Sequence, residues 1–112
     1  MFNSPLTYDL YPYSLFILKT TGGGKDDDGF PIPVTKDWQE LAPCRDQPAG
    51  SGNIISTISG EVTNYSSVIY VPIDTELIEA NSQIEVRSGS TVRLRANVIR
   101  FSKERLHCRI WV

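Results

Sequence analysis

The stretch "TVRLRANVIRFSKERLHCRIWV" (residues 91–112) decides the fold, because its apolar side chains recur at every second position. That period is typical of β-strands that keep one face in water. The polar segment "SKER" (102–105) separates two such runs, so we expect a hairpin that closes the chain. The apolar positions of its two strands are Val92, Leu94, Ala96, Val98, Leu106, Cys108, Ile110 and Val112.

The alternation slips by one residue at Val98 and Ile99, because Ile99 and Phe101 continue the apolar set out of step. A β-bulge or a strong bend produces such a slip, and these devices let a strand curl around a small barrel. The slip therefore favours a curved sheet over a flat one.

Short runs rich in aromatic and β-branched residues predict further strands at 13–20, 67–73 and 84–86. "DWQELAPC" (37–44) is extended by composition, but its pattern does not say which face is buried. Helical periodicity is nearly absent, and "DTELIEANS" (74–82) fits a turn of helix or an irregular loop equally well. With 112 residues, we expect one all-β domain over the whole chain, a small barrel of six or seven antiparallel strands.

A long loop is predicted at "TTGGGKDDDGFPIPVTKD" (20–37), because glycine, proline and aspartate interrupt strand pairing. Loops of this length in small domains are usually mobile or functional. Its three consecutive aspartates lack the alternating spacing of a calcium loop, and "GGGK" lacks the spacing of a phosphate-binding loop. The simplest interpretation of this segment is a solvated loop tip without a specific function, formed by Lys25, Asp26, Asp27 and Asp28.

Charge is divided unevenly along the chain, whose formal net charge is −2. Residues 83–112 carry seven basic and two acidic side chains, whereas the preceding residues carry four basic and eleven acidic ones. The basic end therefore contacts an anionic molecule, faces the acidic part of its own or another copy, or simply lies in solvent.

Candidate catalytic groups are scarce. The one histidine, His107, and its neighbour Cys108 point to opposite faces of a strand, so neither a zinc site nor a nucleophile with its base is indicated. Cys44 and Cys108 fit no metal or redox spacing and are expected to be reduced, buried side chains in a cytoplasmic protein. We expect neither enzymatic activity nor a cofactor, and no apolar run is long enough to span a membrane.

Two non-enzymatic functions stay open, besides the simple solvated edge hairpin. A basic face with Trp111 is typical of small OB-like barrels that bind single-stranded nucleic acid, although one aromatic residue is few for that purpose. Unlike charges on two parts of one chain instead favour head-to-tail self-assembly into a ring.

Several segments together resemble a known family. The chain carries "WQELAPCR" (38–45), "AGSGN" (49–53), "ISGEVTNYSSVIYVP" (58–72) and a closing "RFSKERLHCRIW" (100–111). In this order they resemble the head-completion, or stopper, proteins that join head and tail in tailed phages and prophages of Bacteroides-type bacteria. Asn81 stands where the pattern of that group favours glycine, and asparagine tolerates the left-handed conformation.

The resemblance implies a non-enzymatic small barrel that assembles as a homo-oligomeric ring beneath the portal and adaptor proteins, closes the DNA-filled head and joins it to the tail. Its location would be the host bacterial cytoplasm during assembly and then the head–tail interface of the virion. The isolated chain can be a monomer if the connector is the template.

The same resemblance implies that residues 20–37 narrow the channel, with Lys25, Asp26, Asp27 and Asp28 as candidates for contact with packaged DNA. For the ring contacts we expect pairing between basic and acidic side chains of neighbouring copies. The basic candidates, for the subunit interface or for DNA, are Arg93, Arg95, Arg100, Arg105 and Arg109, and the acidic ones are Asp74, Glu76 and Glu79.

Overall fold

The computed structural model describes residues 10–50, 52–57 and 59–112. Within these ranges the chain forms nine β-strands and no helix, so the predicted all-β fold is confirmed. The strands are β1 (Tyr13–Gly22), β2 (Val34–Pro48), β3 (Ile54–Ser56), β4 (Val62–Asn64), β5 (Ser67–Pro72), β6 (Gln83–Ser88), β7 (Thr91–Asn97), β8 (Arg100–Lys103) and β9 (His107–Trp111).

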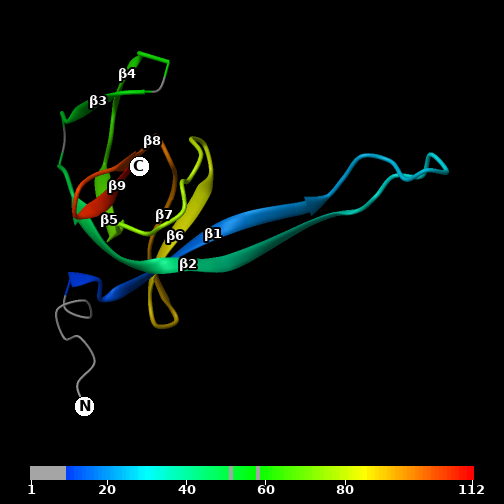
Figure 1. The fold of residues 1–112 in the computed structure, drawn as a ribbon, viewed down its shortest axis with the longest axis horizontal. Coiled ribbons are helices and arrows are strands. Elements are labelled where there is room, and N and C mark those ends of the chain that lie inside the picture. The colour runs from blue at the N-terminus through cyan, green and yellow to red at the C-terminus, as the bar shows by residue number, and fades with distance from the viewer. Residues whose placement is uncertain (1–9, 51, 58) are drawn as a thin grey trace.

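Seven strands form one antiparallel sheet in the order β7-β6-β1-β2-β5-β9-β8, and Figure 1 shows it curled into a compact body. Its edge strands β7 and β8 are not paired with each other, so hydrogen bonds do not close the sheet into the predicted barrel in the described part of the chain. The two edges are instead consecutive along the chain. The Val98 amide donates to Ser82 O on the β6 side (2.9 Å), and the Ile99 amide donates to Trp111 O on the β9 side (2.7 Å). The predicted bend thus lets one stretch of chain serve both edges.

The core lies inside the curled sheet and is built mostly from the inward positions of its strands, to which Ile78, Val98 and Val112 add from segments outside the strands. Burying each aliphatic side chain stabilises the fold by about 1.5–3 kcal/mol. Because alternate residues of a strand point to the same face, the alternation seen in the sequence places these side chains on the inner face of the sheet. The buried apolar residues are Leu15, Ile17, Ala42, Cys44, Ile69, Val71, Ile78, Ile84, Val86, Val98, Cys108, Ile110 and Val112.

A bulge in β2 explains why the 37–44 segment showed no preferred face. Leu15 lies opposite Ala42 while Phe16 lies opposite Glu40, so Leu41 is an extra residue in the ladder. An inserted residue reverses the facing of everything beyond it. The segment therefore has different inward positions on the two sides of Leu41.

Two local predictions are corrected or decided by the structure. Leu106 is not part of the inner face: it lies in the turn between β8 and β9 and is 83% exposed, because strand alternation begins only at His107. Residues 74–82 form an irregular loop with turns, anchored by buried Ile78. Asn81 there has a φ of 72°, the left-handed conformation that asparagine tolerates.

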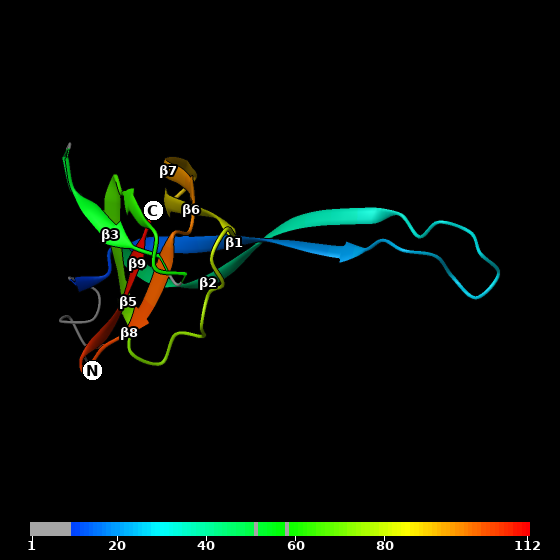
Figure 2. The ribbon, with the colours of Figure 1, turned by 90° about the horizontal axis from the view of Figure 1, so that it is seen from above.

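The prediction of an unpaired loop over residues 20–37 is wrong at both ends. β1 and β2 stay paired as far as Gly22 and Val34, and a bridge between Lys25 and Pro31 continues beyond them. Beyond Ile17 in β1 and before Arg45 in β2, the two strands pair only with each other. Neither face of the ribbon is buried, so the sequence lacks the alternation of buried and exposed positions that predicts a strand. We call residues 19–37 the arm; Figures 1 and 2 show it projecting far from the body.

A smaller hairpin of β3 and β4 lies apart from the main sheet (Figure 1). Its outer residues Ile54 and Val62 are both exposed. No helix in the described ranges has the length and apolar character needed to cross a membrane.

Candidate functional site

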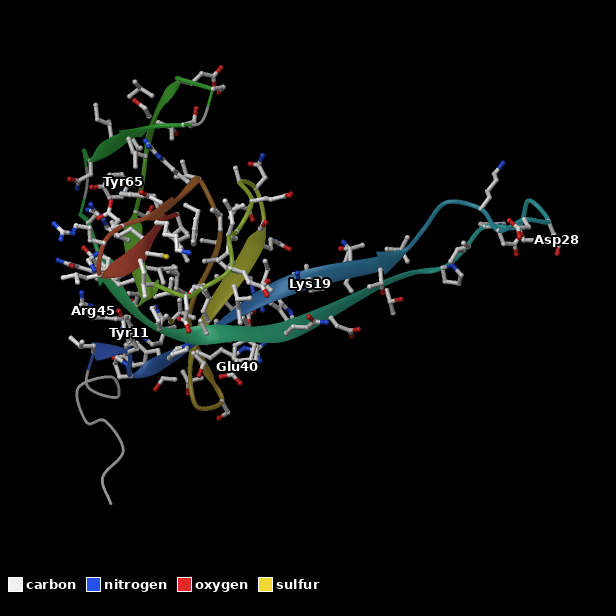
Figure 3. The ribbon with its side chains drawn as sticks, in the orientation of Figure 1. Tyr11, Lys19, Asp28, Glu40, Arg45 and Tyr65 are labelled. Atoms are coloured by element: carbon white, nitrogen blue, oxygen red, sulfur yellow. The ribbon has the colours of Figure 1, made fainter. Side chains whose placement is uncertain are left out.

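The tip of the arm is folded by the first of its three aspartates. Oδ1 of Asp26 accepts hydrogen bonds from the amides of Asp28 and Phe30, both at 2.9 Å, and the Asp26 amide donates to Phe30 O. This is the side-chain mimicry of a turn for which aspartate is suited. Asp27 and Asp28 are exposed beside it, and Figure 3 places Asp28 at the far end of the arm.

The remainder of the arm is solvent-exposed and partly apolar. Every residue from 19 to 37 is exposed except Gly23, which is half-buried. Phe30, Ile32 and Val34 are alternate residues between the tip and the start of β2, and they are 66%, 39% and 57% exposed. Alternate positions of an extended chain share a face, so these three side chains form an apolar edge near the tip.

A buried carboxylate lies at the base of the arm. Glu85 is 1% exposed and accepts hydrogen bonds from the guanidinium groups of Arg87, at 2.8 Å, and Arg95. Burial on its own raises the pKa of Glu85, but the hydrogen bonds and charges of the two arginines outweigh it and hold that pKa below its ordinary value. The guanidinium of Arg87 also lies 3.9 Å from the centre of the Phe16 ring.

Arg93, two residues before Arg95 in β7, has an acidic partner of its own. Its guanidinium donates two hydrogen bonds to Asp46, at 3.0 and 3.3 Å, and lies 4.0 Å from the Tyr13 ring centre. Nearby Cys44 is buried, and burial followed by the charge of Asp46 raises the pKa of its thiol to about 12. Cys44 and Cys108 are both free and buried, as predicted.

The closing hairpin carries the remaining predicted basic candidates. Arg109 pairs with Glu104, and the Arg100 guanidinium donates to Ser56 O at 3.2 Å. Arg105 is exposed in the turn and forms no ion pair with the residues the structure describes. Of the five predicted arginines, three therefore already have an acidic partner within their own chain.

The predicted acidic candidates Asp74, Glu76 and Glu79 all lie in the 73–82 loop between β5 and β6, and all three are exposed. Within the described ranges none of them pairs with a basic side chain. The structure does not bring them together with the arginines in one chain, and their pairing with a neighbouring copy stays a prediction.

One group of side chains was missed from the sequence. β5 pairs with β9 so that Tyr70 faces Arg109 and Val68 faces Trp111, while β2 sets Arg45 opposite Tyr70. The Arg45 guanidinium lies 4.5 Å from the Tyr70 ring centre, and Trp111 has Arg109 at 5.3 Å and Arg100 at 5.9 Å. We call this outer surface of β2, β5, β9 and β8 the aromatic face.

The aromatic face lies away from the arm: Figure 3 shows Arg45 and Tyr65 at the end of the molecule opposite Asp28. A shallow concavity of about 280 Å³ opens there, between Tyr65, Tyr70 and Trp111. In the sequence, Val68 and Tyr70 are two residues apart, as are Arg109 and Trp111, so each pair shares one face of its strand. That the two pairs lie on the same surface follows only from the long-range pairing of β5 with β9.

These features define an all-β protein with a projecting two-stranded arm and a separate basic aromatic surface. Comparison of the chain with known protein families, with curated proteins and with solved structures finds no match.

Proposed function

We propose that this chain is a non-enzymatic structural component of a tailed-phage or prophage head–tail connector, where copies form a ring that closes the head and joins it to the tail. The motifs at residues 38–72 and 100–111 support the proposal through their resemblance to stopper proteins. The observation that carries it is the arm, because such an element has little use in an isolated monomer.

The arm makes the monomer less compact than is usual for a chain of its length. The radius of gyration is 16.5 Å, whereas a compact chain of this length has one of about 13 Å. A two-stranded ribbon is marginally stable by itself in water, and this one exposes apolar Phe30, Ile32 and Val34. Contact with another molecule would cover those side chains and stabilise the ribbon, which is the behaviour expected of an assembly element.

Charge offers a second contact between copies. The exposed loop with Asp74, Glu76 and Glu79 would face basic side chains of a neighbour. Arg105 is the best basic candidate, because it is exposed and has no acidic partner in the described part of its own chain. Arg95 is the next, since its side chain stays 60% exposed despite its contact with Glu85.

Co-assembly with the proteins encoded beside its gene tests the proposal. Where the neighbouring genes encode portal, adaptor and tail proteins, the chain is expressed with them and the complex is purified through a tag on the portal protein. We expect the wild-type chain to co-purify as a ring, and a chain whose arm is cut back to a two-residue turn joining Leu18 to Trp38 to be lost. A full-length chain carrying Lys19→Ala is the matched control for changes to the arm.

Failure of the wild-type chain to join any such complex would overturn the proposal. If the shortened chain joins the complex as well as the wild-type chain does, the arm is not the element that mediates assembly. Reversal of Arg105 to Glu is expected to weaken the ring, and combining it with Glu76→Lys and Glu79→Lys is expected to restore it in part.

A further inference from the structure

We infer that the aromatic face is a binding site for single-stranded nucleic acid. It lies on the opposite end of the molecule from the arm and does not depend on the proposed connector role (Figure 3). The face combines two kinds of group that such a ligand needs: aromatic rings for bases and guanidinium groups for phosphates.

The ring-bearing residues lie close together. Tyr70 and Trp111 lie on adjacent strands two residues out of register, and such diagonal neighbours are about 7–8 Å apart. Tyr65 lines the same concavity, so the surface holds three aromatic side chains where the sequence indicated one. All three are half-buried, which holds each ring in place and leaves part of it open to a ligand.

The cationic groups surround these rings. Arg45, Arg100 and Arg109 contribute three positive charges, against one negative charge from Glu104 on the same face. A chain of net charge −2 thus carries a locally basic surface. Guanidinium groups held against aromatic rings present donors to phosphate and planar surfaces to bases.

Arg45 has donors free for a ligand. Its guanidinium lies 4.5 Å from the Tyr70 ring centre, and it forms no ion pair with the residues the structure describes. Its Nε is buried without a hydrogen-bond partner among the described residues, whereas its terminal nitrogens are not buried. Those terminal nitrogens are the donors that a phosphate group on the aromatic face would meet.

The shape of the surface favours a single strand over a duplex. The concavity is small, about 280 Å³, and its aromatic walls can contact only bases whose faces are exposed. In a duplex those faces are stacked on each other. We therefore expect selection by stacking with little sequence preference.

The test uses the full chain and a fluorescein-labelled strand of twelve thymidines, with binding followed by anisotropy over a range of salt concentrations. Three phosphate contacts predict that log K falls against log salt with a slope of about −2. We expect Arg45→Ala and Trp111→Ala each to weaken binding about tenfold or more, and Lys19→Ala, on the arm, to leave it within twofold.

Fluorescence supplies a second measurement. A Trp38→Phe chain keeps Trp111 as its only tryptophan, and stacking of a base on that ring should quench its emission as the strand is added. Trp111→Ala removes a large half-buried ring, so loss of binding in that variant alone does not distinguish a lost contact from misfolding. Arg45→Ala provides the distinction, because Nε of Arg45 has no hydrogen bond among the described residues to lose. Unchanged urea midpoints of both variants complete the control.

Three results would overturn the inference: no binding at low salt, binding that both variants retain in full, or equal binding of a twelve-base-pair duplex. None of these results bears on co-assembly through the arm, so the site and the connector role fail or stand separately.

Discussion

Replacing Glu85 by glutamine should destabilise the fold by about 2 kcal/mol at neutral pH. The carboxylate is 1% exposed and bridges Arg87 and Arg95, and hydrogen bonds to charged groups contribute about 1.5–3 kcal/mol each. A glutamine keeps one acceptor oxygen but turns an amide donor toward the second arginine. The loss is less than the full value of both contacts, because the Arg87 and Arg95 side chains are 26% and 60% exposed and can turn to water.

Urea denaturation followed by circular dichroism measures this effect. With a slope of about 1–3 kcal/mol per M, the midpoint of E85Q should fall by about 1 M. Glu79→Gln is the matched control, since Glu79 is exposed and has no ion pair in the described part of the chain. It should change the free energy of unfolding by less than about 0.5 kcal/mol.

The same pair of chains has a defined pH dependence. Because the pKa of Glu85 is lower in the folded chain than its ordinary value, its stabilising effect is complete above the unfolded pKa and is lost as pH falls through the folded one. The difference between wild type and E85Q should therefore vanish in acid. A midpoint of E85Q equal to that of the control at pH 7, or a difference that persists unchanged in acid, would refute the account of the buried carboxylate.

Three further predictions follow from local geometry. Gly22→Ala should increase tryptic cleavage within the arm without moving the urea midpoint, because a Cβ at φ 85° would overlap Pro33 O while the body is untouched; unchanged cleavage would contradict it. Ile110→Ala should cost about 2–4 kcal/mol in urea unfolding and Leu106→Ala under about 0.5 kcal/mol, since one is buried and the other 83% exposed; similar costs would count against the assigned turn. Cys44 should react with a thiol reagent at pH 8 only after unfolding, because its pKa is about 12; rapid labelling of the native chain would disprove its burial.

The sequence predicted those parts of the fold in which one strand face is buried. Alternation identified β7 and most of β9, and the slip at Val98 and Ile99 marked the bend that lets the chain serve both sheet edges. Leu106 was misplaced, because a turn residue can continue an apolar spacing by chance. Asn81 adopts the left-handed conformation that its position suggested.

The arm and the aromatic face could not be read from local patterns, for different reasons. Residues 19–37 form a ribbon exposed on both faces, so no buried face marks its backbone pairing in the sequence. Its few apolar residues stand among glycines, prolines and aspartates, which predict a loop. The aromatic face depends on β5 lying beside β9, a pairing between segments some forty residues apart in which Tyr70 meets Arg109. The arginines were predicted as candidates for contacts with a neighbouring copy or DNA, and that stays a prediction. Asp46 and Glu85, the partners of Arg93 and Arg95 within the chain, became apparent only with the sheet order.

The most direct test of the proposed connector role is electron cryo-microscopy of complexes purified from cells that express this chain together with portal, adaptor and tail proteins of a tailed phage or prophage. The account predicts a ring of copies of this chain between head and tail components, with Phe30, Ile32 and Val34 of each arm covered by a neighbouring molecule. A connector that is complete without this chain, or a ring in which all arms point freely into solvent, would contradict it.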